Sequence, residues 1–314
     1  MKEFLRVSPE AADALAGGRA VVAFESTIIS HGMPHPLNIE TALGAERIAR
    51  EMGVVPATVG VLDGRIVVGL GRSEIKLLAT EKGVLQVSRR DISWALARGL
   101  PGATTVCATM FAAHLAGIGV FATGGIGGVH RGAAGGGPRG STFDVSADLG
   151  ELGRTPVCVV AAGAKAVLDL AATLEVLETE GVPVVGFRTR EFPAFWSRSS
   201  GLPLGLSVDS AAEVARMIAV HRSLGLPQGI LVANPVPAEH EIPRAEMEPH
   251  VQRAVQEAES RRIAGKEVTP FLLGRIGELT GGRALETNVH LFHHNVRLAC
   301  EIATELAKLR KDQS

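Results

Sequence analysis

Apolar and polar positions alternate along this chain in two kinds of pattern, one typical of strands and one typical of helices. Short apolar runs predict strands at residues 20–24, 119–123, 156–162, 182–187 and 229–233. A hairpin is predicted over residues 57–70, because Asp63-Gly64 is a favoured two-residue turn. Apolar residues spaced three or four apart predict helices at 37–52, 104–116, 166–177, 210–224, 244–264, 270–279 and 286–311.

This order of elements predicts an α/β fold. We expect three α/β/α layers, with a mixed, mostly parallel central sheet and a helical C-terminal segment. The 314 residues contain no internal repeat and no low-complexity linker, so a single domain over residues 1–314 is predicted. Ser210 stands three residues before Glu213, which predicts a capping box for the helix that follows.

The segment 155–170 joins a predicted strand to a predicted helix and carries a lone lysine, Lys165, at the junction. Its apolar run is continuous, as in a parallel strand buried on both faces, and open α/β sheets bind ligands where such strands end. Apolar neighbours and the positive end of a helix opening at Ala166 favour a neutral amine there. A neutral amine is a nucleophile that can form a Schiff base with a sugar aldehyde. The alternative interpretation is an exposed lysine in the first turn of a helix.

A carboxylate, Glu25, ends the first predicted strand and precedes hydroxyl side chains and a glycine within residues 26–32. Desolvation at a strand end raises the pKa of a glutamate until the group works as an acid or base near neutral pH. The alternative is a glutamate that is hydrogen-bonded to the backbone of the following turn.

Two further segments could carry chemistry. The glycine-rich stretch 123–132 is similar to a phosphate-cradling loop, to which His130 and Arg131 can add charge, although its spacing does not fit a dinucleotide fingerprint. Farther along, Asp144 and Asp148 flank Ser146. On one helical turn both carboxylates would face the same way and hold a divalent cation and a sugar hydroxyl. The alternative is helix capping by Asp144 or Ser146.

Composition argues against several classes of partner. The chain has 32 basic and 33 acidic residues, no block of like charge and no tyrosine, which argues against binding of nucleic acid or anionic membranes. The three cysteines are isolated and lack metal-ligand spacing. No signal peptide and no membrane-spanning stretch is predicted, so a cytoplasmic location is expected.

Strings of residues along nearly the whole chain resemble the pseudouridine-5′-phosphate glycosidases, also called the indigoidine synthase A family. The matching strings follow one another in a single order, which is far more specific than any one motif. They are FESTIISHGMP, PATVGVLDG, VSRRD, GATTVCATM, FATGGIGGVHRGA, TFDVSADL, AGAK, EFPAFWSRSSGLP, VANPVP, GKEVTPFLL and ELTGG.

The resemblance implies reversible cleavage of the C–C glycosidic bond of pseudouridine 5′-phosphate into uracil and ribose 5-phosphate. It also implies a divalent metal, typically Mn²⁺, and a homotrimer of α/β/α subunits whose partner is a small-molecule substrate. By resemblance, the nucleophile is Lys165, the proton donor is Glu25 and the metal ligand is Asp144. Substrate contacts are expected, again by resemblance, at Gln86, Val106, His130, Ser146, Ala147, Asp148 and Asn288.

Two departures from the family pattern are visible. Gln86 stands where the family usually carries a lysine, so affinity for phosphate or uracil is expected to be weaker unless Arg89 or Arg90 substitutes. The glycine-rich insertion 134–140 is longer than usual and could alter the cover of the site. The alternatives to this function are the same mechanism on a related phosphorylated C-nucleoside, and a sugar-phosphate-binding protein without catalysis. A dinucleotide-dependent oxidoreductase is disfavoured by the glycine spacing.

Overall fold

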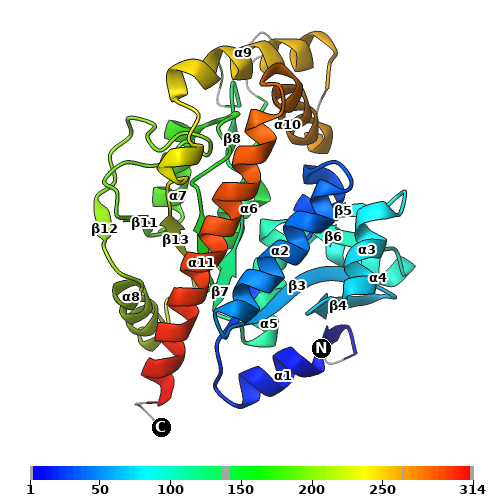
Figure 1. Cartoon of the computed structure of the whole chain (residues 1–314), viewed down its shortest axis with the longest axis vertical. Helices are drawn as coiled ribbons and strands as arrows, with labels where there is room; N and C mark the ends of the chain where they lie inside the picture. The colour runs from blue at the N-terminus through cyan, green and yellow to red at the C-terminus, as the bar shows by residue number, and fades with distance from the viewer. Residues whose placement is uncertain (1–2, 134, 136–141, 264, 312–314) are drawn as a thin grey trace.

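The computed structural model describes residues 3–133, 135, 142–263 and 265–311, and Figure 1 shows its three layers. The insertion 134–140 therefore lies outside the described residues except for Gly135. None of the described helices is both long enough and apolar enough to cross a membrane.

The middle layer is a mixed, mostly parallel sheet. Its main path runs in the order β1-β4-β3-β2-β7-β9-β13-β11-β12, with the pair β5 and β6 attached to β3. The bounds along this path are β1 (Leu5–Val7), β4 (Arg65–Val68), β3 (Val55–Leu62), β2 (Val21–Phe24), β7 (Val120–Ala122), β9 (Cys158–Ala161), β13 (Ile230–Ala233), β11 (Val184–Phe187) and β12 (Leu206–Val208). The attached pair is β5 (Leu85–Val87) and β6 (Gly102–Thr104).

The central strands β2, β7, β9 and β13 run parallel, and all their residues except those at a few strand ends are almost fully buried. Burial on both faces explains their continuous apolar runs. Strands β3 and β4 form the predicted hairpin, and both Asp63 (φ 50°) and Gly64 (φ 70°) have the left-handed backbone of its two-residue turn.

Helices cover both faces of the sheet (Figure 1). The long helix α11 (Arg283–Lys311) packs between α2 (Leu37–Glu51) and α8 (Ala211–Ser223) on one face, while α5 (Val106–Ala116), α6 (Ala147–Leu152) and α7 (Leu170–Thr179) lie on the other. The remaining helices are α1 (Pro9–Ala16), α3 (Arg72–Thr80), α4 (Ile92–Arg98), α9 (Arg244–Ser260) and α10 (Val268–Leu279). The predicted fold class and the capping box of Ser210 and Glu213 are confirmed.

The prediction of a helix from Ala166 is wrong. Residues Leu168–Asp169 form a short strand, β10, which pairs antiparallel with β8 (Val129–His130). Helix α7 begins only at Leu170, where the Asp169 side chain caps it by accepting the amide of Ala172. The apolar spacing of 167–177 did not reveal this, because a two-residue strand adds too few positions to shift the helical period.

Candidate active site

Two adjoining cavities lie where the parallel strands end. The larger has a volume of about 340 Å³ and is lined mainly by polar and charged residues, and the narrower has a volume of about 70 Å³ and a mostly apolar lining. Five residues line both cavities: Glu25, Thr27, Gln86, Lys165 and Thr269. Because β2 and β9 are parallel, the residues following them, Glu25 and Lys165, are brought to the same edge of the sheet, as the sequence predicted.

Lys165 is held in a loop between β9 and β10 rather than in a helix. Its backbone amide donates to the carbonyl of Ile126 at 3.1 Å, and its own carbonyl accepts the amide of Leu168 at 3.0 Å. The half-buried side chain faces both cavities. The expectation that a helix terminus directly adjoins Lys165 is therefore wrong, because the first residue of α7 is Leu170.

Glu25 is nearly inaccessible to solvent, with 7% of its surface exposed. Burial raises the pKa of its carboxyl group. The positive charge of Lys165 and the hydroxyl of Thr123, which donates to Glu25 Oε1, act in the opposite direction, whereas the negative charge of Asp148 adds to the rise. The net result is a carboxyl that keeps its proton to higher pH than an exposed glutamate, which suits a proton donor.

Most of the other predicted residues line the larger cavity, namely Gln86, Val106, His130, Asp144, Ser146, Ala147 and Asp148. Asn288 lines the narrower one. Burial lowers the pKa of His130, although the nearby carboxylate of Asp144 opposes this and Lys165 adds to it. His130 is thus a neutral imidazole near neutral pH, able to exchange hydrogen bonds without carrying charge.

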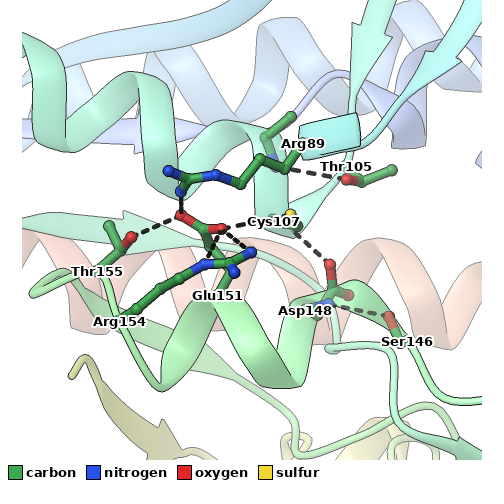
Figure 2. Close-up of polar contacts among 9 residues, drawn as sticks. Arg89, Thr105, Cys107, Ser146, Asp148, Glu151, Arg154 and Thr155 are labelled. Carbon is green, nitrogen blue, oxygen red and sulfur yellow. Dashed lines mark hydrogen bonds and ion pairs between the residues drawn. The ribbon is translucent and has the colours of Figure 1, made fainter. Parts of the chain in front are cut away.

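The two carboxylates at 144 and 148 do not share a helical turn, so that expectation is wrong. Asp144 precedes α6, and Ser146 is the residue that caps this helix, accepting the amide of Asp148 at 3.2 Å. The Asp148 carboxylate accepts the amide of Cys107 at 2.9 Å (Figure 2) and the amide of Gly127 at 2.8 Å. Asp148 therefore connects α5, α6 and the glycine loop at the cavity wall, and one hydrogen bond to each carboxylate oxygen fixes its orientation.

The glycine loop has a packing role that its sequence did not reveal. The amides of Ile126 and Gly127 donate to Gly163 and Asp148, so they do not point toward a ligand. A side chain at Gly127 would collide with Ser146 Oγ. The glycines let the loop pack closely against its neighbours. Arg131 forms an ion pair with Glu248 at 2.7 Å.

Asn288 has a fixed orientation. Its side-chain oxygen accepts the indole N–H of Trp196 at 2.7 Å, and Trp196 is completely buried. The amide N–H₂ of Asn288 is therefore the end left to donate to a ligand carbonyl in the narrow cavity. No local pattern marks Trp196 as a site residue, because the pairing joins residues that are 92 positions apart.

Other cavity residues were also missed. His31 lies in the single π-helical turn η1 (Ile28–Gly32) and lines the narrow cavity. Burial lowers the pKa of His31, and its Nε2 is buried without a hydrogen-bond partner among the described residues. Short π-helical turns often mark functional sites, but the sequence gives no signal for one.

Of the two arginines that follow Gln86, one faces away from the larger cavity and the other lines it. Arg89 faces away from the cavity and forms an ion pair with the fully buried Glu151 (Figure 2). Its guanidinium also stacks over the ring of Phe111. Arg90 lines the larger cavity, and so does Lys266, which no pattern in the sequence marks as a site residue. Of the two arginines proposed to replace the family lysine, only Arg90 reaches the site.

In the part of the chain that the structure describes, the protein offers one carboxylate, that of Asp144, at the predicted metal site, which fits a cation held mainly by water and substrate oxygens. The described residues contain no cluster of three or more side chains suited to a metal, and within them no salt bridge involves the half-buried carboxylate of Asp144. One carboxylate together with water and phosphate oxygens is a common way to hold a hard divalent ion such as Mg²⁺, and carboxylate and water ligands suit Mn²⁺ as well. A protein-built cage of several ligands does not fit.

The fold and the site define an α/β protein with a buried carboxyl group and a lysine converging at the ends of parallel strands. The chain matches the family described as "Indigoidine synthase A like protein" over residues 10–305 and belongs to that family. The pseudouridine-5′-phosphate glycosidase of Deinococcus radiodurans is 55% identical over 309 residues, which cover 98% of this chain and 97% of the relative. The glycosidase of Solibacter usitatus is 57% identical over 302 residues, which cover 96% and 99%.

Two solved structures share the fold. The prealnumycin C-glycosynthase AlnA in complex with ribulose 5-phosphate superposes with a TM-score of 0.89 at 37% identity, covering 99% of both chains. An indigoidine synthase A-like protein from Thermotoga maritima gives a TM-score of 0.86 at 39% identity, covering 97% of both chains.

Proposed function

We propose that this protein reversibly cleaves the C–C glycosidic bond of pseudouridine 5′-phosphate, giving uracil and ribose 5-phosphate. The observation that carries this proposal is the meeting of two chemically different cavities at Lys165 and Glu25. The narrow, mostly apolar cavity suits a flat base, and the larger cavity, with its many polar and charged lining residues, suits a sugar phosphate. The bond between base and sugar would then lie beside the amine and the carboxyl group.

The reaction needs covalent help, because a C–C bond offers no leaving oxygen that an acid can protonate. Lys165 Nζ attacks C1′ of the sugar, the bond from C1′ to the ring oxygen breaks, and that oxygen takes the proton that the nitrogen releases. The nitrogen lone pair then forms a C=N bond while the C1′–C5 bond breaks. The electron pair passes to C5 of uracil, which takes the proton of Glu25. Water hydrolyses the protonated imine, restores the amine, releases ribose 5-phosphate and returns a proton to Glu25.

The remaining side chains position the substrate. Asn288 donates its amide N–H₂ to a carbonyl of the base, because Trp196 holds the oxygen of that side chain. We propose that Asp144, with His130 beside it, holds Mn²⁺ through water and substrate oxygens; the bound ion would supply positive charge that orients the sugar phosphate. Interactions with remote groups of the substrate then help to align the reacting carbon.

The proposal is tested by incubating purified protein and Mn²⁺ with pseudouridine 5′-phosphate and measuring free uracil. Borohydride reduction in the presence of ribose 5-phosphate, followed by peptide mass spectrometry, should place a pentose phosphate adduct on Lys165. Lys308→Arg, at an exposed lysine far along α11, serves as the control that keeps the adduct. Uracil release without any adduct on Lys165 would remove the covalent mechanism but keep the activity.

A related phosphorylated C-nucleoside is the second candidate substrate, because the neutral Gln86 lines both cavities. Comparing kcat/KM for pseudouridine 5′-phosphate and for base-modified analogues separates the two. We also propose a homotrimer, which the family resemblance supports. Light scattering during size exclusion should then give three times the chain mass of 32.8 kDa.

A further inference from the structure

One edge of the larger cavity carries a lysine that is held in place by protein contacts. Lys266 belongs to the short 3₁₀ helix η4 (Gly265–Glu267), which directly precedes α10. Its ammonium lies 2.7 Å from Asp91 Oδ2 and 3.0 Å from the backbone carbonyl of Gln86. Asp91 is itself fixed, because its carboxylate accepts both the amide and the hydroxyl of Ser88 at 3.0 Å.

The ammonium of Lys266 is thus held in place at the cavity more firmly than the guanidinium of Arg90, the neighbouring cation. The Arg90 side chain is 76% exposed, and its Nε lies 3.6 Å from Asp91 Oδ1. The Lys266 side chain is only 42% exposed, and its contact with Asp91, at 2.7 Å, is shorter. Two positive charges face one carboxylate at this edge, so the edge carries a net positive charge that suits an anion.

The other groups expected to bind a phosphate are engaged elsewhere. Arg131 and Arg89 form ion pairs with Glu248 and Glu151, and the glycine-loop amides of Ile126 and Gly127 bond to the protein. Gln86 supplies no charge, and Lys165 lies beside Glu25, where the reacting carbon is expected. Among the described residues that line this cavity, Lys266 is therefore the cation best placed for a phosphate.

We propose that Lys266 binds the 5′-phosphate of the substrate and supplies the positive charge that Gln86 lacks, an inference that rests on the proposed function. Asp91 acts as a positioning residue that holds the ammonium at the cavity edge. Lys266 is also linked to α10, whose Pro270 and Leu273 line the narrow cavity. Phosphate binding at Lys266 therefore also stabilises the helix that covers the base.

The test compares wild type with Lys266→Gln, using pseudouridine 5′-phosphate as substrate and inorganic phosphate as a competing anion. Loss of a charge-assisted hydrogen bond should raise KM and the inhibition constant of phosphate at least about tenfold, with kcat changed less than about twofold. Adding Gln86→Lys to the variant should restore much of the lost affinity, because a second ammonium then reaches the same edge. Lys308→Gln, which removes a lysine paired with Glu305 on the surface, is the matched control.

The outcomes separate this inference from the proposed function. If wild type releases no uracil, the proposed function fails, and phosphate binding by calorimetry still tests Lys266 alone. If wild type is active and Lys266→Gln keeps both KM and phosphate inhibition within about twofold, the role of Lys266 is overturned. Equal losses of kcat and phosphate affinity, with a lowered unfolding midpoint, would instead assign Lys266 a merely structural role.

Discussion

Glu151 on α6 is a buried carboxylate that links α6 to η2 (Arg89–Asp91), two elements beside the candidate site. Its side chain is completely inaccessible and pairs with Arg89 from η2, the short helix that follows Gln86 by three residues (Figure 2). The same carboxylate accepts the Thr155 hydroxyl at 2.6 Å and two guanidinium nitrogens of Arg154 at 3.0 and 3.1 Å. Glu151 thereby connects η2 to the helix that begins at the cavity.

Glu151→Ala should destabilise the fold by about 3 kcal/mol, because removing one member of a buried ion pair costs roughly 3–5 kcal/mol. The lower end applies, since the side chain of Arg89 is 38% exposed and can turn toward water. Arg154→Ala removes a partner that is 54% exposed, so its cost should stay below about 1 kcal/mol.

The thermal midpoint of each variant is measured by calorimetry. The free energy of unfolding is measured by urea titration, with tryptophan fluorescence as the signal. A loss of about 3 kcal/mol corresponds to a drop of roughly 6–12 °C in the thermal midpoint of a large domain. At temperatures where both variants remain folded, Glu151→Ala should also raise KM, because the wall carrying Gln86 is no longer tied to α6. A midpoint for Glu151→Ala no lower than that of Arg154→Ala would refute the argument that burial makes this pair important.

Three further predictions concern the site itself. Because burial raises the pKa of Glu25, its protonated form contributes stability that is fully present below the unfolded pKa and is lost as pH rises through the folded pKa. Uracil release should fall over the same rise in pH. Glu25→Gln should abolish release and should melt higher than wild type above the folded pKa but not below the unfolded pKa; a pH-independent difference in melting would contradict this. Trp196→Phe leaves the oxygen of Asn288 without its 2.7 Å donor, so KM should rise several-fold and stability should drop by about 1–3 kcal/mol, as urea titration would detect. Asp144→Ala should weaken Mn²⁺ binding in calorimetry, and chelation should stop wild-type turnover; unchanged Mn²⁺ affinity would place the ion elsewhere.

The sequence by itself determined the layers and most of the elements. Continuous apolar runs identified β2, β9 and β13, since a strand buried on both faces must be apolar throughout. Helical periodicity located α2, α8 and α11 to within a few residues, and Ser210 with Glu213 marked the start of one of them. The strand ends also pointed to Glu25 and Lys165, because parallel strands deliver their following residues to one edge.

Only the tertiary structure decided which side chains are available for chemistry. Asp148 and Arg89 have the right residue types for a site, yet the fold engages them with the amides of Cys107 and Gly127 and with Glu151. Lys266 lies 180 positions after Gln86 and reaches its backbone only because η4 and β5 meet across the cavity. A sequence pattern reports local period and residue type, whereas long-range hydrogen bonds and burial depend on packing between distant segments, and these set the charge and orientation of each functional group.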